Sequence, residues 1–182
     1  MIRYYVTDRR QGRGGWAGGI AAFAKRAIDD GVDMIQVREK DLPAKELFEI
    51  VCRIRDLARD TNTKVLVNDR LDVALAAQVN GVHLPSNGLP AERVRPFVKV
   101  LGVSTHSVEE AIRAEMAGAD FIVFGPVFET PGKTPAGLDA LARVIAAVKL
   151  PVLAIGGVTI TNAHQVRDCG AAGIAGIRLF QT

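Results

Sequence analysis

The chain has few of the residues that carry redox, metal or base-stacking chemistry. Its 182 residues include two cysteines, three histidines and one tryptophan, and aromatic residues make up 5% of the total. Cys52 and Cys169 stand far apart, without CxxC or metal-type spacing, so we expect small core thiols in a reducing compartment. The low aromatic content and the absence of a basic–aromatic run argue against a surface on which nucleic-acid bases stack.

Long apolar runs and a one-sided charge are also missing. No apolar stretch reaches the roughly 18 residues of a transmembrane helix. The start, Met1-Ile2-Arg3-Tyr4-Tyr5-Val6, is typical of a strand and has no signal-peptide pattern. The net charge is only +3 and the basic residues are scattered, so we expect neither nucleic acid nor a membrane as a partner. These features predict a cytoplasmic protein.

What is present fits one globular domain over residues 1–182, with 48% hydrophobic and 24% charged residues. Short β-branched runs alternate with longer helical patterns. The predicted strands are Arg3–Thr7, Met34–Arg38, Lys64–Val67, Gly81–Leu84, Lys99–Val103, Phe121–Phe124, Val152–Ile155 and Gly173–Ile177. The predicted helices are Gly18–Asp30, Ala44–Asp60, Leu71–Gln78, Pro90–Phe97, Val108–Ala117, Leu138–Val148 and Asn162–Cys169. Several strands are apolar throughout, as in parallel sheets covered on both faces.

This strict alternation predicts an α/β fold, a (β/α)8 TIM barrel. The rival is an open dinucleotide-binding sheet, because Gly12-Arg13-Gly14-Gly15-Trp16-Ala17 matches GxGxxA. That motif should follow its strand closely, yet four residues separate Thr7 from Gly12, and no ribose-binding acid ends the next strand. The barrel is therefore favoured.

The end of the chain predicts an incomplete outer ring. Only Arg178-Leu179-Phe180-Gln181-Thr182 follow the eighth strand, so the last outer helix is expected to be missing. A shortened chain, a partner such as a second copy covering the gap, or weakened stability would each account for this pattern.

Polar side chains cluster where the second predicted strand ends. Side chains alternate across a strand, so Gln36, Arg38 and Lys40 leave on one face. An amide, a guanidinium and an ammonium that converge in this way suit a polyanion, and a diphosphate above all. Charge placed at a strand end for solubility is the alternative interpretation.

Other strand ends carry polar or glycine residues, and barrel enzymes place their sites in these loops. Asn68 and Asp69 could cap the next helix, or Asp69 could bind Mg²⁺. Gly156-Gly157 would let backbone amides approach an oxyanion, or would only form a tight turn. Thr130 and Lys133 lie in a Gly/Pro-rich loop that could close over a ligand or remain a solvated surface loop.

The histidines indicate little by themselves. His164 is expected to be exposed on a helix, and His83 and His106 end strands without a third zinc ligand. Ser104, His106 and a carboxylate could imitate a hydrolase triad, but the GxSxG turn is absent, which disfavours a hydrolase.

Taken jointly, these motifs resemble the thiamine-phosphate synthase/TenI family of small TIM barrels over nearly the whole chain. The similarity runs from Tyr4-Tyr5-Val6-Thr7-Asp8 to Gly173-Ile174-Ala175-Gly176. The matching segments between them are Gln36-Val37-Arg38-Glu39-Lys40, Val67-Asn68-Asp69-Arg70, Gly81-Val82-His83-Leu84, Gly102-Val103-Ser104-Thr105-His106-Ser107, Gly118-Ala119-Asp120-Phe121, Phe124-Gly125-Pro126-Val127-Phe128-Glu129-Thr130 and Ala154-Ile155-Gly156-Gly157.

The resemblance implies a transferase of thiamine biosynthesis that joins hydroxymethylpyrimidine diphosphate to hydroxyethylthiazole phosphate, giving thiamine phosphate and diphosphate. It assigns the pyrimidine diphosphate to Gln36, Arg38, Lys40, Asn68, Ser104 and Lys133. Three of these, Arg38, Lys40 and Lys133, would be the catalytic cations, and Asp69 would bind Mg²⁺. The thiazole phosphate would contact Thr130, Gly157 and the Ile177-Arg178 backbone, and Gly132 and Gly156 complete the substrate-binding set.

Three positions depart from the family pattern. Gly88 stands where a second Mg²⁺-binding aspartate is usual, Gly132 replaces a threonine, and Arg178 replaces a serine. The loss of a carboxylate should weaken Mg²⁺ binding and slow the departure of diphosphate.

Two alternatives therefore stay open beside the favoured synthase. One is a TenI-like tautomerase of the thiazole carboxylate phosphate, although Pro126 stands where that activity uses a histidine. The other is a non-catalytic protein that binds thiamine precursors.

Overall fold

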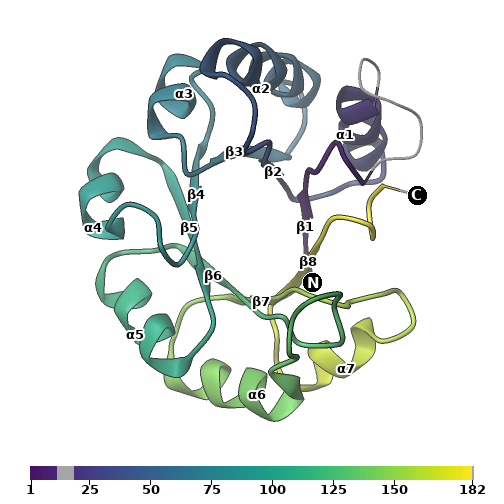
Figure 1. Ribbon diagram of the computed structural model, residues 1–182, viewed down its shortest axis with the longest axis vertical. Coiled ribbons are helices and arrows are strands. Elements are labelled where there is room, and N and C mark those ends of the chain that lie inside the picture. The colour runs from purple at the N-terminus through teal and green to yellow at the C-terminus, as the bar shows by residue number, and fades with distance from the viewer. Residues whose placement is uncertain (12–18, 182) are drawn as a thin grey trace.

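Eight parallel strands close into a barrel in chain order (Figure 1). The computed structural model describes residues 1–11 and 19–181. The strands are β1 (Ile2–Val6), β2 (Met34–Val37), β3 (Lys64–Asn68), β4 (Gly81–Leu84), β5 (Val100–Thr105), β6 (Phe121–Phe124), β7 (Val152–Ala154) and β8 (Gly173–Gly176). The predicted barrel is confirmed, because β8 pairs with β1 from Ile2↔Gly173 to Tyr5↔Gly176 and leaves no open edge. The closed sheet excludes the open dinucleotide-binding fold, whose motif at 12–17 lies outside the described residues.

Helices surround the strands as an outer ring (Figure 1). They are α1 (Gly19–Asp29), α2 (Ala44–Ala58), α3 (Leu71–Ala76), α4 (Ala91–Val94), α5 (Val108–Met116), α6 (Gly137–Ala147) and α7 (Ala163–Asp168), and a 3₁₀ turn, η1 (Arg95–Phe97), follows α4. One helix was predicted too long: the stretch 90–97 is broken after Val94, because Pro96 has no N–H to continue the α-helical hydrogen bonds.

Among the described residues, no helix follows β8. Residues 177–181 lie between α7 and α1 in the outer ring (Figure 1). The Phe180 ring is buried against Tyr5, with the ring centroids 5.7 Å apart, and Gln181 Nε2 donates to Tyr5 Oη at 3.0 Å. This segment therefore covers part of the outer face of β1 where the ring has no helix.

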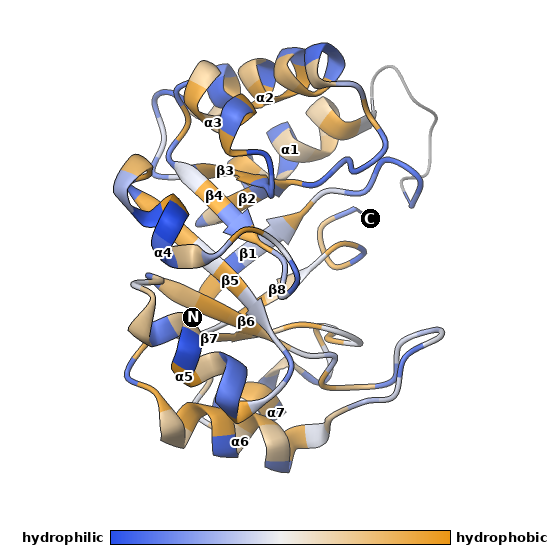
Figure 2. Ribbon diagram, turned by 60° about the vertical axis from the view of Figure 1, so that its left-hand side comes forward, coloured by the Kyte–Doolittle hydropathy of each residue, from blue (hydrophilic) through white to orange (hydrophobic). Residues whose placement is uncertain are grey.

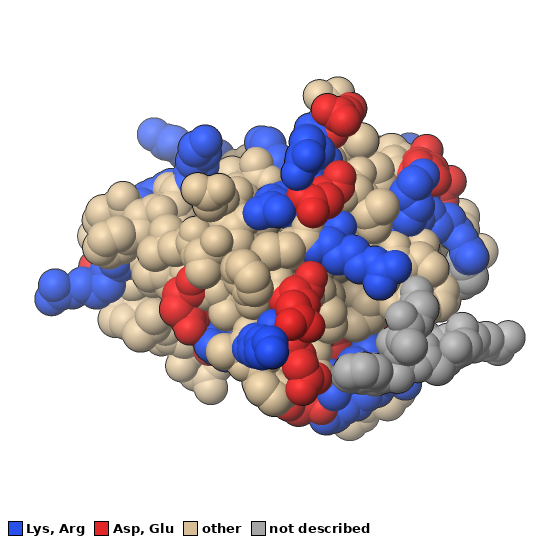
Figure 3. Space-filling view, turned by 90° about the horizontal axis from the view of Figure 1, so that it is seen from above, with Lys and Arg blue, Asp and Glu red and all other residues tan. Residues whose placement is uncertain are grey.

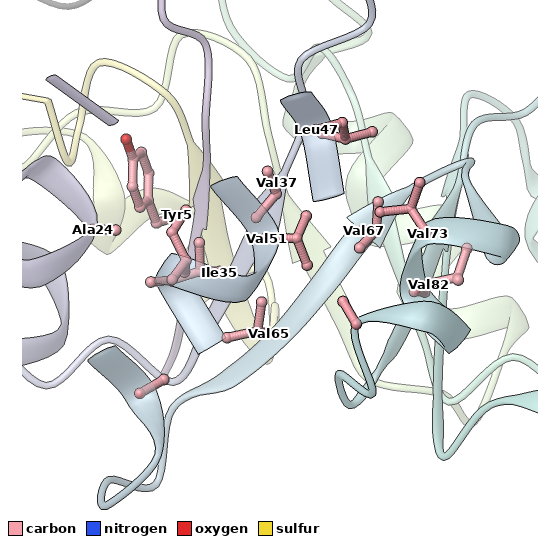
Figure 4. Packing of buried hydrophobic residues seen from close by; sticks show 14 of the residues in the cluster. Tyr5, Ala24, Ile35, Val37, Leu47, Val51, Val65, Val67, Val73 and Val82 are labelled. Atoms are coloured by element: carbon pink, nitrogen blue, oxygen red, sulfur yellow. The ribbon is translucent and has the colours of Figure 1, made fainter. Parts of the chain in front are cut away.

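The apolar residues form two layers, one inside the barrel and one between the strands and the helices. Figure 2 shows hydrophobic stretches both in the strands and along the helices that surround them. Figure 4 shows the outer layer, in which Ile35, Val37 and Val67 point from β2 and β3 toward Val51 of α2. The inner layer consists of Tyr4, Met34, Leu66, Phe121, Val123, Leu153 and Ala175. Because side chains alternate along a strand, the residue two positions after an inner one faces the barrel axis at its carboxyl end. This register places polar residues above the inner layer.

The two cysteines are free and half-buried, each packed against the outer layer. They are thus peripheral core residues rather than fully enclosed ones. No helix in residues 1–11 and 19–181 is both long and apolar enough to cross a membrane.

Candidate functional site

A cavity of about 1040 Å³ opens at the carboxyl ends of the strands. Its lining includes eleven of the residues that the sequence singled out: Gln36, Arg38, Lys40, Asn68, Ser104, Thr130, Lys133, Gly156, Gly157, Ile177 and Arg178. Two of the predicted site residues, Asp69 and Gly132, are not part of the lining. The structure thus brings residues from six of the eight strand ends together, and their individual roles toward a ligand stay predictions.

Four cationic side chains reach this cavity: Arg38, Lys40, Lys133 and Arg178. Within the described part of the chain, none of these four side chains forms an ion pair or a hydrogen bond. Of the described residues, only two carboxylates, Asp8 and Glu129, line the cavity beside the four cations, so the net charge of this lining is positive. Unpaired cations around a concave site favour a ligand with several negative charges.

The outside of the barrel differs from the cavity. On the face seen in Figure 3, lysine and arginine side chains are interspersed with aspartate and glutamate. Outer arginines are commonly paired, as in Arg70–Asp72 at 2.7 Å and Arg95–Asp120 at 2.6 Å. Other outer cations, such as Lys99 and Arg143, have no ion pair with any described residue, so the cavity is distinguished by four such side chains that face one concave site.

Buried polar side chains form the floor of the cavity. Gln36 Nε2 donates to Tyr4 Oη at 3.1 Å, Tyr4 Oη lies 3.3 Å from His83 Nδ1, and His83 Nε2 lies 2.8 Å from Ser104 Oγ. Burial, together with the nearby positive charge of Arg38, lowers the pKa of His83 to about 3, so the ring is neutral at physiological pH. The floor is a hydrogen-bonded row of neutral groups below the cations.

The hypothetical hydrolase triad does not form. Ser104 pairs with His83, whereas His106 Nδ1 pairs with the Gly125 carbonyl at 2.6 Å. The serine and His106 are therefore engaged with different partners, which removes the structural basis of a hydrolase.

Gly156 and Gly157 adopt left-handed backbone conformations, with φ of 91° and 65°. A Cβ on Gly156 would lie 2.4 Å from Pro126 Cβ, and one on Gly157 would lie 2.5 Å from the Glu129 carbonyl oxygen. Neither N–H donates a hydrogen bond within the described residues, and both residues line the cavity. The pair thus forms a tight turn and still leaves its amides available to an oxyanion.

The helix-capping interpretation of Asn68 and Asp69 is wrong. The residue at the N-cap of α3 is Arg70, and no side chain caps that helix. Asp69 instead has a φ of 62° and donates its N–H to the His83 carbonyl at 3.0 Å. A left-handed backbone costs free energy for a residue other than glycine, although aspartate tolerates it better than most; Gln78, which does not line the cavity, shares this conformation.

Gly88 lies directly beside the Asp69 carboxylate. A Cβ on Gly88 would lie 2.8 Å from Asp69 Oδ1 and 2.8 Å from Pro85 Cδ. The family resemblance, which places the two Mg²⁺-binding positions at Asp69 and Gly88, is thus consistent with their proximity in space. Within the described residues, no group of three His, Cys, Asp or Glu side chains converges on a point that could hold a metal ion.

The loop after β6 is a tight turn rather than an irregular loop. Thr130 and Lys133 form an antiparallel bridge, with Lys133 N–H donating to the Thr130 carbonyl at 3.0 Å. Gly132, with φ of 74°, makes this turn and does not line the cavity. The turn places Lys133 at the cavity.

The sequence patterns assigned no site role to the floor residues Tyr4 and His83: Tyr4 stood only in a matching segment, and His83 was named only as a strand-end histidine in another. The signal was the alternation itself: His83 lies opposite Asn68 and Gly102 in the barrel, on the inner side of β4. Finding it required the register between strands, which the sequence pattern alone did not supply.

Comparison with known proteins identifies a family for the chain. A family model described as thiamine monophosphate synthase matches residues 3–180. The thiamine-phosphate synthases of Methanoculleus marisnigri and Roseiflexus sp. are 42% and 40% identical to the chain; the matches cover 94% and 96% of it and 83% and 75% of those proteins. A solved thiamine phosphate pyrophosphorylase from Pyrococcus furiosus is 36% identical with a TM-score of 0.89, covering 100% of this chain and 88% of that one. With its closed barrel and its row of strand-end motifs, the chain belongs to the thiamine monophosphate synthase family.

Proposed function

We propose that the protein is a thiamine-phosphate synthase. The enzyme would join hydroxymethylpyrimidine diphosphate to hydroxyethylthiazole phosphate and release diphosphate. Membership of the family supports the reaction. The single structural observation that carries the proposal is the set of unpaired cations, Arg38, Lys40 and Lys133, around one cavity whose floor is neutral and polar.

The chemistry fits such a site. The bond between the pyrimidine methylene carbon and the diphosphate oxygen breaks, and both of its electrons leave with diphosphate. The electron-rich ring stabilises the cation that remains, and the lone pair of the thiazole nitrogen then forms the new C–N bond. The leaving charge is what needs neutralisation, so three positioned cations serve the reaction better than a strong base would.

The amides of Gly156 and Gly157 offer the second phosphate a place in the same cavity. They lie on the loop after β7, where TIM barrels commonly bind phosphate. We assign the thiazole phosphate to this turn, with Thr130 and the Ile177-Arg178 backbone beside it.

The residues present fit Mg²⁺ only in part. Asp69 is a carboxylate without a hydrogen bond from any described residue, and Gly88 beside it supplies no second one. Mg²⁺ is commonly held by one or two carboxylates together with substrate phosphate, so we assign it to Asp69 plus diphosphate oxygens. When bound, it would add positive charge to the leaving group.

The test is an assay with both phosphorylated precursors and Mg²⁺ that follows thiamine phosphate and diphosphate. Equal amounts of the two products above a protein-free control are expected. Lys133→Ala should reduce their formation, whereas Lys149→Ala, at an exposed position before β7, should leave it unchanged. The absence of product with the wild-type protein would refute the synthase.

The tautomerase alternative has one observation in its favour. Pro126 cannot act as an acid or base, but His106 lines the cavity beside it and contacts the Gly125 carbonyl. If His106 moves a proton between thiazole carboxylate isomers, His106→Asn should abolish their interconversion without affecting diphosphate binding. Interconversion no faster than in buffer would exclude this activity.

The cytoplasmic location and a homo-oligomeric state stay proposals. Phosphorylated precursors as substrates are consistent with a cytoplasmic location. Light scattering would measure the oligomeric state.

A further inference from the structure

Two aromatic residues under the cavity have no part in the chemistry above. Tyr4 and His83 are fully or almost fully buried, with exposed fractions of 0% and 2%. They connect two cavity-lining side chains, Gln36 and Ser104, through three consecutive hydrogen bonds of 3.1, 3.3 and 2.8 Å. Because buried polar groups are costly unless paired, such a row requires each member to be satisfied.

One arrangement of hydrogens gives every member of this row a partner. Gln36 Nε2 is a donor, so Tyr4 Oη accepts from it, and the one hydroxyl hydrogen of Tyr4 goes to its other partner, His83 Nδ1. A neutral imidazole carries one ring hydrogen, which must then sit on Nε2. Nε2 donates to Ser104 Oγ, and the Ser104 hydroxyl is left to donate into the cavity.

The surroundings hold the His83 ring in place. Its centroid lies 5.7 Å from that of Tyr4 and 5.9 Å from that of Phe121. On β5, a Cβ on Gly102 would lie 2.6 Å from His83 Nδ1 and 2.4 Å from Phe121 Cζ. Only a glycine there leaves room for the ring between its neighbours.

The row itself requires a neutral ring. A doubly protonated imidazole could not accept the Tyr4 hydroxyl hydrogen at Nδ1, which would leave that hydrogen without a partner.

We propose that Tyr4 and His83 are positioning residues that fix the Ser104 hydroxyl as a hydrogen-bond donor and the Gln36 amide in one orientation. The cavity floor then selects a ligand that presents a lone pair, such as a ring nitrogen or a phosphate oxygen, to Ser104. The nature of that ligand rests on the proposed function, where hydroxymethylpyrimidine diphosphate would be the molecule bound.

The first test needs no ligand. In the wild-type protein labelled with ¹⁵N-histidine, we expect the His83 ring to show one tautomer, with the hydrogen on Nε2, from about pH 5.5 to 8. His83→Gln identifies the signal among the three histidines. A hydrogen on Nδ1 or a mixture of tautomers would overturn the proposal.

The second test uses a matched pair of variants. Tyr4→Phe and Tyr5→Phe each delete one buried hydroxyl from adjacent residues of β1, but Tyr5 faces outward and pairs with Gln181. Tyr4→Phe should weaken binding of hydroxymethylpyrimidine diphosphate about threefold to tenfold, the effect of losing one hydrogen bond, and should mix the His83 tautomers. Tyr5→Phe should leave both unchanged. Equal effects of the two variants on affinity would overturn the proposal.

A double mutant separates a connected row from independent contacts. Because Tyr4 acts through Ser104, the variant combining Tyr4→Phe with Ser104→Ala should bind about as weakly as Ser104→Ala alone. Losses that simply add would show that Tyr4 acts elsewhere. If the protein makes no thiamine phosphate while the tautomer and the matched variants behave as expected, the proposed function fails and the positioning row stands.

Discussion

Arg38 is partly buried at the edge of the cavity, a position that suits anion binding. Its backbone N–H donates to Thr7 Oγ1 at 2.9 Å, while its half-buried guanidinium reaches the cavity without a carboxylate partner. Replacing Arg38 with alanine should weaken the binding of inorganic diphosphate by about 1.5–3 kcal/mol, the value of hydrogen bonds to a charged group. Isothermal titration calorimetry would measure this loss. Arg167→Ala, at an exposed residue of α7 paired with Asp168, should not change the affinity; an equal loss in both variants would remove Arg38 from the site.

Gly88 is the residue at which the metal hypothesis can be examined directly. A side chain there would start 2.8 Å from Asp69 Oδ1, so both Gly88→Asp and Gly88→Asn should lower the stability of the protein without metal by crowding. Only Gly88→Asp adds a second carboxylate, whose repulsion with Asp69 a divalent cation relieves. We expect Mg²⁺ to raise the melting temperature of Gly88→Asp more than that of Gly88→Asn. An equal rise in melting temperature in both variants would show that Asp69 does not bind Mg²⁺.

At the scale of the element, ion pairs connect the loop after β1 to the loop after the neighbouring strand, β2. Arg9, after β1, forms ion pairs with Glu39 at 3.1 Å and with Asp41 at 2.5 Å, both after β2. The buried Glu39 also accepts from Thr7 Oγ1 at 2.7 Å. These contacts hold together the two loops that flank the diphosphate-binding residues of β2.

The pH dependence of the free energy of unfolding should reveal the ion pair between Arg9 and Asp41. Hydrogen bonds from Arg9, and secondly from Arg10, hold the pKa of Asp41 well below its usual range. A lowered pKa in the folded state gives stability that is present above the unfolded pKa of about 3.9 and is lost as the pH falls through the folded value. The free energy of unfolding should therefore fall less between about pH 5 and 2 in Asp41→Asn than in the wild type. Arg10→Gln removes only the second partner and should change this slope less; identical slopes in the wild type and Asp41→Asn would contradict the interpretation.

Elements with a strong pattern were predictable, whereas short connections were not. The β-branched runs indicated every strand because parallel strands are apolar on both faces. The turn at Thr130–Lys133 and the left-handed Asp69 were not predicted, since no local pattern specified the bridge within that turn or the hydrogen bond from Asp69 to the His83 carbonyl of β4. At the site, alternation along one strand gave Gln36, Arg38 and Lys40, but His83 required the alignment of β3, β4 and β5.

At the scale of the whole molecule, closure of the barrel depends on very close strand contacts. A Cβ on Gly173 of β8 would lie 2.4 Å from the Ile2 carbonyl oxygen of β1, and one on Gly125 would lie 2.1 Å from the Ile155 carbonyl oxygen. These contacts involve backbone atoms, which cannot move aside without shifting a strand. The absence of a side chain at Gly173 is thus a condition for β8 to join β1 and to bring Ile177 and Arg178 to the cavity.

The final prediction concerns this closure. Gly173→Ala should lower the free energy of unfolding by about 1–3 kcal/mol through overpacking, and should weaken anion binding as β8 shifts. Gly19→Ala is the matched control: among the described residues, its Cβ would meet Phe23 alone, at 3.8 Å, in the first turn of α1. Since alanine restricts the unfolded chain more than glycine, this variant should gain about 0.4–1 kcal/mol. Urea unfolding followed by circular dichroism measures both changes. Similar stabilities for the two variants would mean that β1 and β8 tolerate a wider spacing, and that the carboxyl-terminal part of the cavity does not depend on their close contact.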